Sequence, residues 1–213
     1  MNAHTIETRT HGRYLVSWRP EATALVVGFH GYGENAVLHL EALERVVADR
    51  PARIVSIQGL NCFYTKANRV VAGWMTSEDR ELAIADNLAY VSAVVAEVER
   101  EYGRAERVVY AGFSQGVAMA YRAAAFIPRR CDGLILLAGD VPPDVAPHAS
   151  ALPATLLGRG TTDEWYTSEK ASRDVRTLGE AGVNLTEHVF TGGHVWEATF
   201  VARAGVFLDE RLA

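Results

Sequence analysis

Cysteine is scarce in this chain, and its scarcity excludes two kinds of protein. Only Cys62 and Cys131 occur among the 213 residues. Two cysteines this far apart provide neither a disulfide framework nor the spaced ligands of a structural metal site. A chain of this length buries roughly 70% of the surface that it would expose when unfolded, so it needs no such cross-link. We therefore predict a protein with reduced thiols in the cytoplasm.

Long apolar runs and an excess of positive charge are missing as well. No stretch approaches the roughly 18 consecutive apolar residues that a membrane span requires. The first residues, Met1–Trp18, alternate polar and apolar side chains, unlike a signal peptide. The 21 Lys and Arg residues face 26 Asp and Glu, a formal net charge of −5, whereas a nucleic-acid binder would show a basic excess. We expect no nucleic-acid partner and no stable membrane insertion.

Short aliphatic runs alternate with amphipathic helical patterns along the chain. The predicted strands are Ala24–Phe29, Arg53–Ile57, Arg107–Ala111, Gly133–Ala138, Ala154–Leu157 and Leu185–Phe190. Several are apolar almost throughout, as expected of strands that helices cover on both faces. A long helix is indicated from Ile84 to Val98 and another from Phe200 to Leu208. We predict one α/β domain over residues 1–213 with a mostly parallel central sheet, and an antiparallel edge hairpin at Thr5–Trp18.

A glycine-flanked serine follows one of these strands and opens a helical pattern. The segment Gly112-Phe113-Ser114-Gln115-Gly116 comes after the run that ends at Ala111, and Val117–Phe126 continues as a helix. This context is typical of a nucleophile elbow, a sharp turn that exposes the serine hydroxyl. The chain passes so close to such a turn that both flanking positions need residues without a Cβ atom. The pattern predicts that Ser114 is a catalytic nucleophile.

A nucleophilic serine needs a general base, and the chain has seven histidines. His194 follows the last predicted strand after two glycines, so we expect it at the same sheet edge as Ser114. His30 also follows a strand, but it precedes the serine, whereas α/β-hydrolases have the order serine, acid, histidine. We predict His194 as the base. The remaining histidines, interpreted as packed or solvated side chains, are His4, His11, His39, His148 and His188.

The base in turn needs an orienting acid, and two aspartates follow predicted strands. Asp163 comes after Leu156-Leu157-Gly158, and Asp140 comes one strand earlier, after Ala138-Gly139. Either carboxylate is suitable, because the acid only has to reach the imidazole N–H. The spacing favours Asp163 and leaves Asp140 open; the aspartate that is not used is interpreted as a turn or helix-capping residue.

A tetrahedral intermediate also requires two N–H donors aimed at its oxyanion. One is expected from Gln115, the residue after the nucleophile, at the beginning of a helix. The other should come from the loop after an early strand, and His30-Gly31-Tyr32-Gly33 is such a loop. Its glycines allow a backbone N–H to turn toward the site. We predict the amide of Tyr32 as the second donor.

These segments, in this order, resemble the phospholipase/carboxylesterase family of α/β-hydrolases, which includes bacterial carboxylesterases and acyl-protein thioesterases. The resemblance runs from about Ala24 to the end of the chain. It implies an α/β-hydrolase fold, places the acid at Asp163 rather than Asp140, and maps the oxyanion donors onto Tyr32 and Gln115. A tryptophan of the family in the loop before the long helix is similar to Trp74.

The sequence also departs from the family pattern. Val117 replaces a glycine after the elbow, Arg159 replaces a histidine, and Met75 and Thr76 follow Trp74 where an aspartate is frequent. The connection Gly139–Pro153 is short and begins with polar and proline residues, so it cannot form a lid domain. Short-to-medium acyl groups are the expected substrates. Residues expected to line the substrate pocket are Phe63, Tyr64, Trp74, Met75 and Trp165.

The functional hypothesis is a carboxylesterase-type serine hydrolase that acts on a small-molecule ester, with no cofactor and no metal. Three alternatives use related chemistry or the same scaffold. A lysophospholipase or acyl-thioesterase would share the acyl-enzyme, and an acyltransferase would pass the acyl group to an alcohol or thiol. A non-catalytic binding protein on a hydrolase fold is the least favoured, because the triad is complete in the sequence. Whether the chain forms a homodimer is left open.

Overall fold

One sheet of seven strands organises the computed structural model, which describes residues 2–17 and 19–213. The strands are β1 (Tyr14–Val16), β2 (Ala24–Phe29), β3 (Ala52–Ile57), β6 (Arg107–Phe113), β7 (Gly133–Leu137), β8 (Thr155–Gly160) and β9 (Leu185–Phe190). Their order across the sheet is β1-β3-β2-β6-β7-β8-β9, and only β1 runs antiparallel to its neighbour. The predicted mostly parallel sheet is confirmed.

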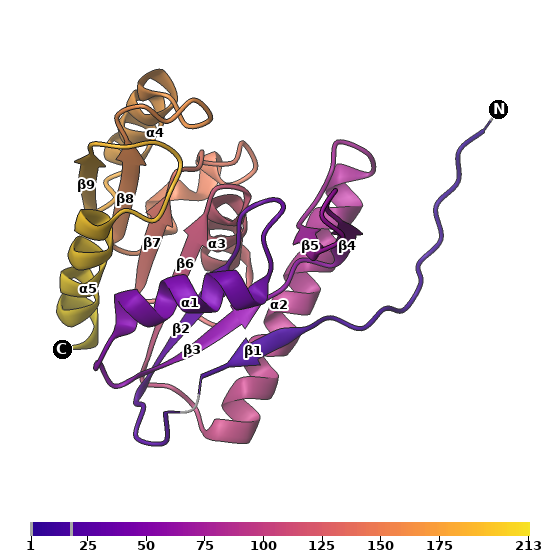
Figure 1. The fold of residues 1–213 in the computed structure, drawn as a ribbon, viewed down its shortest axis with the longest axis horizontal. Coiled ribbons are helices and arrows are strands. Elements are labelled where there is room, and N and C mark those ends of the chain that lie inside the picture. Colours follow the sequence, from indigo (N-terminus) through magenta and orange to yellow (C-terminus); the bar gives the residue numbers. More distant parts are fainter. Residues whose placement is uncertain (1, 18) are drawn as a thin grey trace.

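Helices cover both faces of this sheet, which explains its apolar strands. Every residue of β2, β3 and β7 is buried. The helices are α1 (Ala36–Val47), α2 (Arg80–Tyr102), α3 (Gln115–Phe126), α4 (Ser168–Glu180) and α5 (Ala198–Leu212), with a short 3-10 helix η1 (Ala146–Ala151). Figure 1 shows α1 and α5 on one face and α2 and α3 on the other. None of the helices in residues 2–17 and 19–213 has the length and apolarity to cross a membrane.

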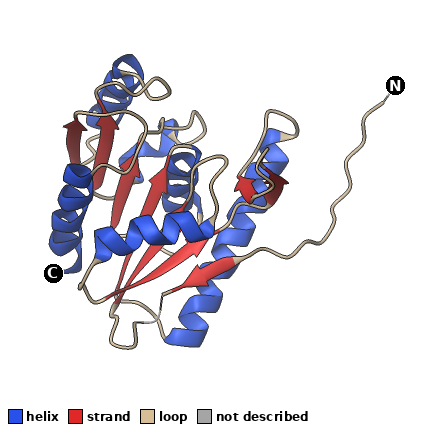
Figure 2. Cartoon of the chain, in the orientation of Figure 1, coloured by secondary structure: helices blue, strands red, loops and turns tan. Residues whose placement is uncertain are grey.

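The connections change direction beside β2, and this places several loops together. From β2 the chain moves outward to β3, then crosses to β6 on the other side of β2 and continues outward to β9. Ligands bind beyond the carboxyl ends of parallel strands at such a switch point. The register pairs Phe29 with Gly112, so the loops after β2 and β6 begin side by side. Figure 2 shows these loops at one end of the sheet.

The predicted hairpin at Thr5–Trp18 is wrong for the described residues; Trp18 itself lies outside them. Only Tyr14–Val16 forms a strand, paired antiparallel with Val55–Ile57 of β3. Residues 2–13 are all exposed, and Ile6 keeps 91% of its surface accessible. The apolar residues of this alternating segment therefore do not pack against a sheet.

A second sheet was not predicted. Strands β4 (Asn61–Tyr64) and β5 (Val70–Gly73) form an antiparallel hairpin apart from the main sheet, visible beside α2 in Figure 1. It is joined to the loop after β2, because the Gly33 N–H donates to the Ala72 carbonyl at 3.0 Å and the Ala72 N–H donates to the Glu34 carbonyl at 2.7 Å. The hairpin thus anchors one of the loops at the switch point.

His39 is a buried titratable residue under this end of the sheet. Its side chain lies on α1 against the Trp196 ring, and neither ring nitrogen has a hydrogen-bond partner among the described residues. Burial disfavours the imidazolium and lowers the pKa of His39 from 6.5 to about 3. His39 is therefore neutral in the folded protein at neutral pH.

This burial predicts a pH-dependent contribution to stability. Below pH 6.5 the unfolded chain binds a proton at His39 that the folded protein does not bind until the pH nears 3. The free energy of unfolding should therefore fall as the pH drops through this window, by up to about 1.4 kcal/mol per pH unit from this group. Urea denaturation at pH 7 and pH 5 should show a smaller decrease for His39→Met than for the wild type. The control is His148→Gln, which replaces an exposed histidine. An equal decrease of the free energy of unfolding in all three proteins would contradict the prediction.

Candidate active site

The turn between β6 and α3 holds Ser114 in an unusual backbone conformation. Its φ is 53° and its ψ is −118°, a strained region for a residue with a Cβ atom. A Cβ atom at Gly116 would lie 1.9 Å from the Phe29 carbonyl oxygen, and one at Gly112 would lie 2.5 Å from the Gly116 carbonyl oxygen. Only glycine fits at these two positions. The side chain of Ser114 is half-buried and lies on the wall of a cavity.

His194 and Asp163 are joined by a hydrogen bond at the same end of the sheet. The His194 Nδ1 atom lies 2.8 Å from Asp163 Oδ2. The other carboxylate oxygen accepts the backbone N–H groups of Trp165 and Tyr166, each at 2.9 Å. An ionised carboxylate only accepts, so Nδ1 carries the proton and Nε2 keeps a free electron pair. This is the tautomer that can remove a proton from an alcohol.

The His194 ring lies beside the elbow. Its centroid is 4.9 Å from that of Phe113, the residue before Ser114. The described residues show no hydrogen bond between the Ser114 hydroxyl and His194 Nε2. Such contacts are frequently long in a free enzyme and shorten when substrate binds. The structure thus brings Ser114, His194 and Asp163 to one edge of the sheet.

Asp140, the other candidate acid, is held elsewhere. Its carboxylate forms ion pairs with Lys170 at 3.5 Å and with Arg173 at 3.6 Å, both on α4. It has no contact with His194 among the described hydrogen bonds and ion pairs, whereas Asp163 does. The geometry therefore associates the imidazole with Asp163.

Two backbone N–H groups in the loops after β2 and β6 have no acceptor among the described residues. In the loop after β2, the Gly31 N–H donates to Glu34 Oε2 at 2.8 Å and the Gly33 N–H donates to Ala72. The Tyr32 N–H between them has no acceptor in the described part of the chain. The Gln115 N–H, at the beginning of α3, has none there either. These are the two amides that the sequence predicts as oxyanion donors.

Glu34 is a residue of the site that the sequence analysis missed. Burial raises the pKa of its carboxyl group, while the Gly31 N–H and the nearby His194 lower it. The carboxylate holds the loop after β2 in its turn through Gly31 and lies close enough to interact with the charge of His194. An acidic residue directly after a glycine-rich loop was the available signal.

The side chain of Gln115 connects the elbow to the segment after β5. Its Oε1 atom accepts the Trp74 N–H at 2.7 Å, and its Nε2 atom donates to the Met75 carbonyl at 3.0 Å. Trp74 itself is fully buried, packs against Phe29, and donates its indole N–H to the His30 carbonyl at 2.9 Å. The expectation that Trp74 lines the substrate pocket is therefore wrong, because its ring fills the core below the loop.

The other predicted pocket residues fall into two groups. Phe63 stacks on the Tyr32 ring, with centroids 5.2 Å apart, and Tyr64 is exposed; neither lines the cavity beside Ser114. Met75 and Trp165 do line it, and Trp165 keeps 72% of its surface accessible. Phe63 and Tyr64 stand on the hairpin β4–β5, and a contact of theirs with substrate stays a prediction.

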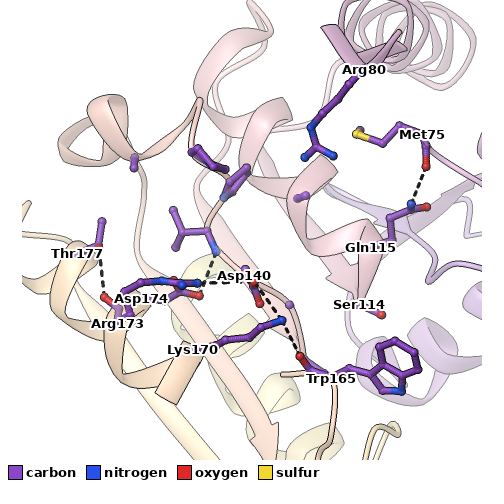
Figure 3. Close-up of a pocket in the computed structure, with 17 residues that line it drawn as sticks. Met75, Arg80, Ser114, Gln115, Asp140, Trp165, Lys170, Arg173, Asp174 and Thr177 are labelled. Atoms are coloured by element: carbon purple, nitrogen blue, oxygen red, sulfur yellow. Dashed lines mark hydrogen bonds and ion pairs between the residues drawn. The ribbon is translucent and has the colours of Figure 1, made fainter. Parts of the chain in front are cut away.

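The cavity beside Ser114 has a volume of about 720 Å³. Figure 3 shows its lining residues, which come from α2, α3, α4, the connection after β7, and the loops that carry Met75, Ser114 and Trp165. Part of the wall is formed by small and apolar residues: Met75, Ala118, Ala138, Val141, Pro142 and Pro143. Another part of the wall is formed by charged residues: Arg80, Asp140, Lys170, Arg173 and Asp174. No group of three His, Cys, Asp or Glu within residues 2–17 and 19–213 is arranged to hold a metal ion.

Comparison with known proteins now identifies the fold and the family. The sequence profile of the Phospholipase/Carboxylesterase family matches residues 12–211, nearly the whole chain. The chain belongs to the phospholipase/carboxylesterase family. It is therefore a hydrolase of the carboxylesterase type with an α/β-hydrolase fold. No curated protein matches the chain.

Several solved structures of esterases and thioesterases have the same fold. Esterase PE8 is 23% identical, with a TM-score of 0.73 over 94% of this chain and 98% of that one. A carboxylesterase from Mesorhizobium loti is 18% identical, with a TM-score of 0.75 over 93% and 94% of the two chains. Acyl-protein thioesterase 2 of Zea mays is 17% identical, with a TM-score of 0.73 over 95% and 100%. At these identities the likeness concerns the fold.

The contrast between the two aspartates gives a prediction for this hydrolase. Asp163→Asn should lower kcat on the order of 10⁴-fold, as in a serine protease whose orienting aspartate is replaced, because the amide would favour the wrong imidazole tautomer. Asp140→Asn, the matched control on the same sheet edge, should change kcat far less. Steady-state hydrolysis of a nitrophenyl ester measures both. A larger loss for Asp140→Asn would show that the acid stands after β7.

Proposed function

We propose that this family member hydrolyses carboxylic esters through an acyl-enzyme on Ser114. The observation that carries the proposal is the hydrogen-bonded pair His194–Asp163 at the sheet edge where the strained turn presents Ser114. A nucleophile, a base with a free electron pair and an acid that fixes its tautomer are the three parts that acyl transfer needs.

In the proposed acylation step, Ser114 Oγ attacks the acyl carbon and His194 Nε2 takes the hydroxyl proton. The imidazolium then protonates the departing alkoxide, and the alcohol leaves. Asp163 stabilises the imidazolium through Nδ1 and keeps the ring in place. The two backbone N–H donors of Trp165 and Tyr166 hold Asp163 itself, so the acid is positioned before substrate binds.

The proposed oxyanion donors are the N–H groups of Tyr32 and Gln115. Both lack an acceptor among the described residues, so they can bind the developing charge without breaking another hydrogen bond. The beginning of α3 adds the favourable end of a helix dipole at Gln115. In deacylation a water molecule takes the place of the alcohol: His194 accepts its proton, and the carboxylic acid leaves Ser114.

The same site would also cleave an acyl thioester, since a thiolate is the better leaving group and needs less help from His194. A solved relative of this fold is an acyl-protein thioesterase. Esters and thioesters share the acyl half of the substrate. The residues that line the cavity therefore limit the acyl group of an ester and of a thioester in the same way.

We propose short-to-medium acyl groups as substrates. The connection Gly139–Pro153 contains only the short helix η1, and its first residues line the cavity. The wall changes from apolar residues to the charged side chains Asp140, Lys170 and Arg173. An acyl chain long enough to reach these charges gains no further apolar burial.

The nucleophile is tested by replacement and by covalent labelling. Ser114→Ala should lower kcat on the order of 10⁵-fold or more, because no other group forms the acyl-enzyme. A fluorophosphonate should add its mass to one site in the wild type and in the exposed control Ser150→Ala, but not in Ser114→Ala. Labelling that persists in Ser114→Ala would disprove the assignment.

The acyl preference is tested with nitrophenyl esters from acetate to palmitate below their micelle concentrations. Each buried CH₂ group is worth about 0.8 kcal/mol, or roughly fourfold in kcat/KM. The kcat/KM should rise over the first few acyl carbons and then fall, because longer chains meet the charged wall or water. A maximum at laurate or beyond would mean that a long apolar channel exists.

A further inference from the structure

The cavity beside Ser114 carries a charge distribution that plain ester hydrolysis does not require. Three cationic side chains line it, Arg80 from α2 and both Lys170 and Arg173 from α4. Two acidic side chains line it as well, Asp140 and Asp174. In Figure 3 Arg80 enters from one side of the cavity, and Lys170 and Arg173 stand on the other side.

The charges on α4 are already engaged with protein groups. Asp140 pairs with Lys170 and with Arg173, and Lys170 also donates to the Trp165 carbonyl at 2.8 Å. Asp174 accepts the Val141 N–H and the Tyr166 hydroxyl, each at 3.1 Å, and lies 3.5 Å from Arg173. Burial raises the pKa of Asp174. The two cations of this wall, Lys170 and Arg173, are thus already paired with the half-buried carboxylate of Asp140.

Arg80 differs from these residues because it has no partner. Within residues 2–17 and 19–213 its guanidinium makes no hydrogen bond and no ion pair. The carboxylate of Asp144, whose pKa Arg80 helps to lower, is already occupied by two hydrogen bonds from Arg122 at 2.7 and 2.8 Å. The acidic neighbours of Arg80 in the sequence, Glu78, Asp79 and Glu81, do not line the cavity. Arg80 is itself exposed, so its five donors are available to a ligand in the cavity beside Ser114.

The lining also indicates which half of a substrate enters this space. Ser114 and Gln115 line the cavity, but His194 does not. The leaving-group oxygen has to lie within hydrogen-bond reach of His194 Nε2 to be protonated. The alcohol half therefore points toward His194, and the acyl half extends into the cavity. The acyl group passes Met75, Ala118 and Val141 before it reaches the charged residues.

We propose that the acyl group of the substrate ends in a carboxylate, which binds the guanidinium of Arg80. The substrate class is the half-ester, or half-thioester, of an aliphatic dicarboxylic acid. This inference rests on the proposed acyl-enzyme function of Ser114. Hydrolysis would release the alcohol or thiol first and the free dicarboxylate second, with water as the only co-reactant.

Arginine suits this task because its planar fork matches the two oxygens of a carboxylate. The apolar part of the wall accepts a short methylene chain, and the cationic part accepts its charged end. A neutral acyl chain of the same length would leave Arg80 without a partner. It would therefore bind with a less favourable free energy than the anionic chain. The preference should weaken with salt, since charges are screened over about 10 Å at 0.1 M ionic strength.

The experiment compares three nitrophenyl esters of equal acyl length: the adipic half-ester, its neutral methyl ester, and the hexanoate. The wild type should hydrolyse the anionic ester with a kcat/KM roughly tenfold or more above that of the two neutral esters. This ratio is the effect expected from the free energy of one charge-assisted hydrogen bond. Arg80→Gln should reduce this ratio to near one, mainly through KM. Arg176→Gln, an exposed arginine on α4 outside the cavity, should keep the ratio of the wild type.

The possible failures are distinguishable. If the wild type cleaves the neutral esters as well as the anionic one, the dicarboxylate proposal is overturned and the esterase function stands. An equal loss for all three esters in Arg80→Gln would give Arg80 a structural role and overturn the proposal too. If the wild type cleaves none of the esters and resists a fluorophosphonate, the proposed function itself fails, and the inference fails with it.

Discussion

The close approach of two backbone segments at Gly116 is the constraint on which the site depends. The first turn of α3 lies against the carbonyl groups of Phe29 and His30 at the end of β2, with no room for a Cβ atom between them. This contact fixes Ser114, the proposed nucleophile, relative to the loop that follows β2. The serine and the Tyr32 N–H therefore share one rigid junction, and their geometry follows from sheet packing rather than from flexible side chains.

A chain of polar contacts extends this junction into the second sheet. The buried His30 accepts the Gly59 N–H through Nε2 at 2.9 Å, and its carbonyl accepts the indole N–H of Trp74. Gln115 then binds the backbone on both sides of the Trp74–Met75 peptide. Groups that could be mistaken for catalytic residues, a histidine and a tryptophan after a strand, instead hold three loops at fixed positions. Satisfied buried polar networks have this rigidifying effect.

Much of this arrangement could be predicted from the sequence because it depends on local chemistry. Continuous apolar runs indicated the buried strands, and the glycines around Ser114 indicated a turn that no other residue could make. The hairpin β4–β5 gave no such signal, since Asn61–Tyr64 is mostly exposed and combines polar with aromatic residues. The burial of Trp74 and the lack of a partner for Arg80 depend on contacts between segments far apart in the chain. Those contacts cannot be deduced from spacing.

The cavity wall and the proposed catalytic residues are carried by different elements. Ser114 and the N–H groups of Tyr32 and Gln115 stand at the carboxyl ends of β2 and β6, whereas the charged wall residues stand on α2, α4 and the connection after β7. Substitutions on these outer elements leave the glycine-packed junction untouched. An ancestral enzyme with this layout could exchange one acyl specificity for another by single surface-facing mutations. Divergence of metabolic role within the family would then proceed without loss of the underlying chemistry.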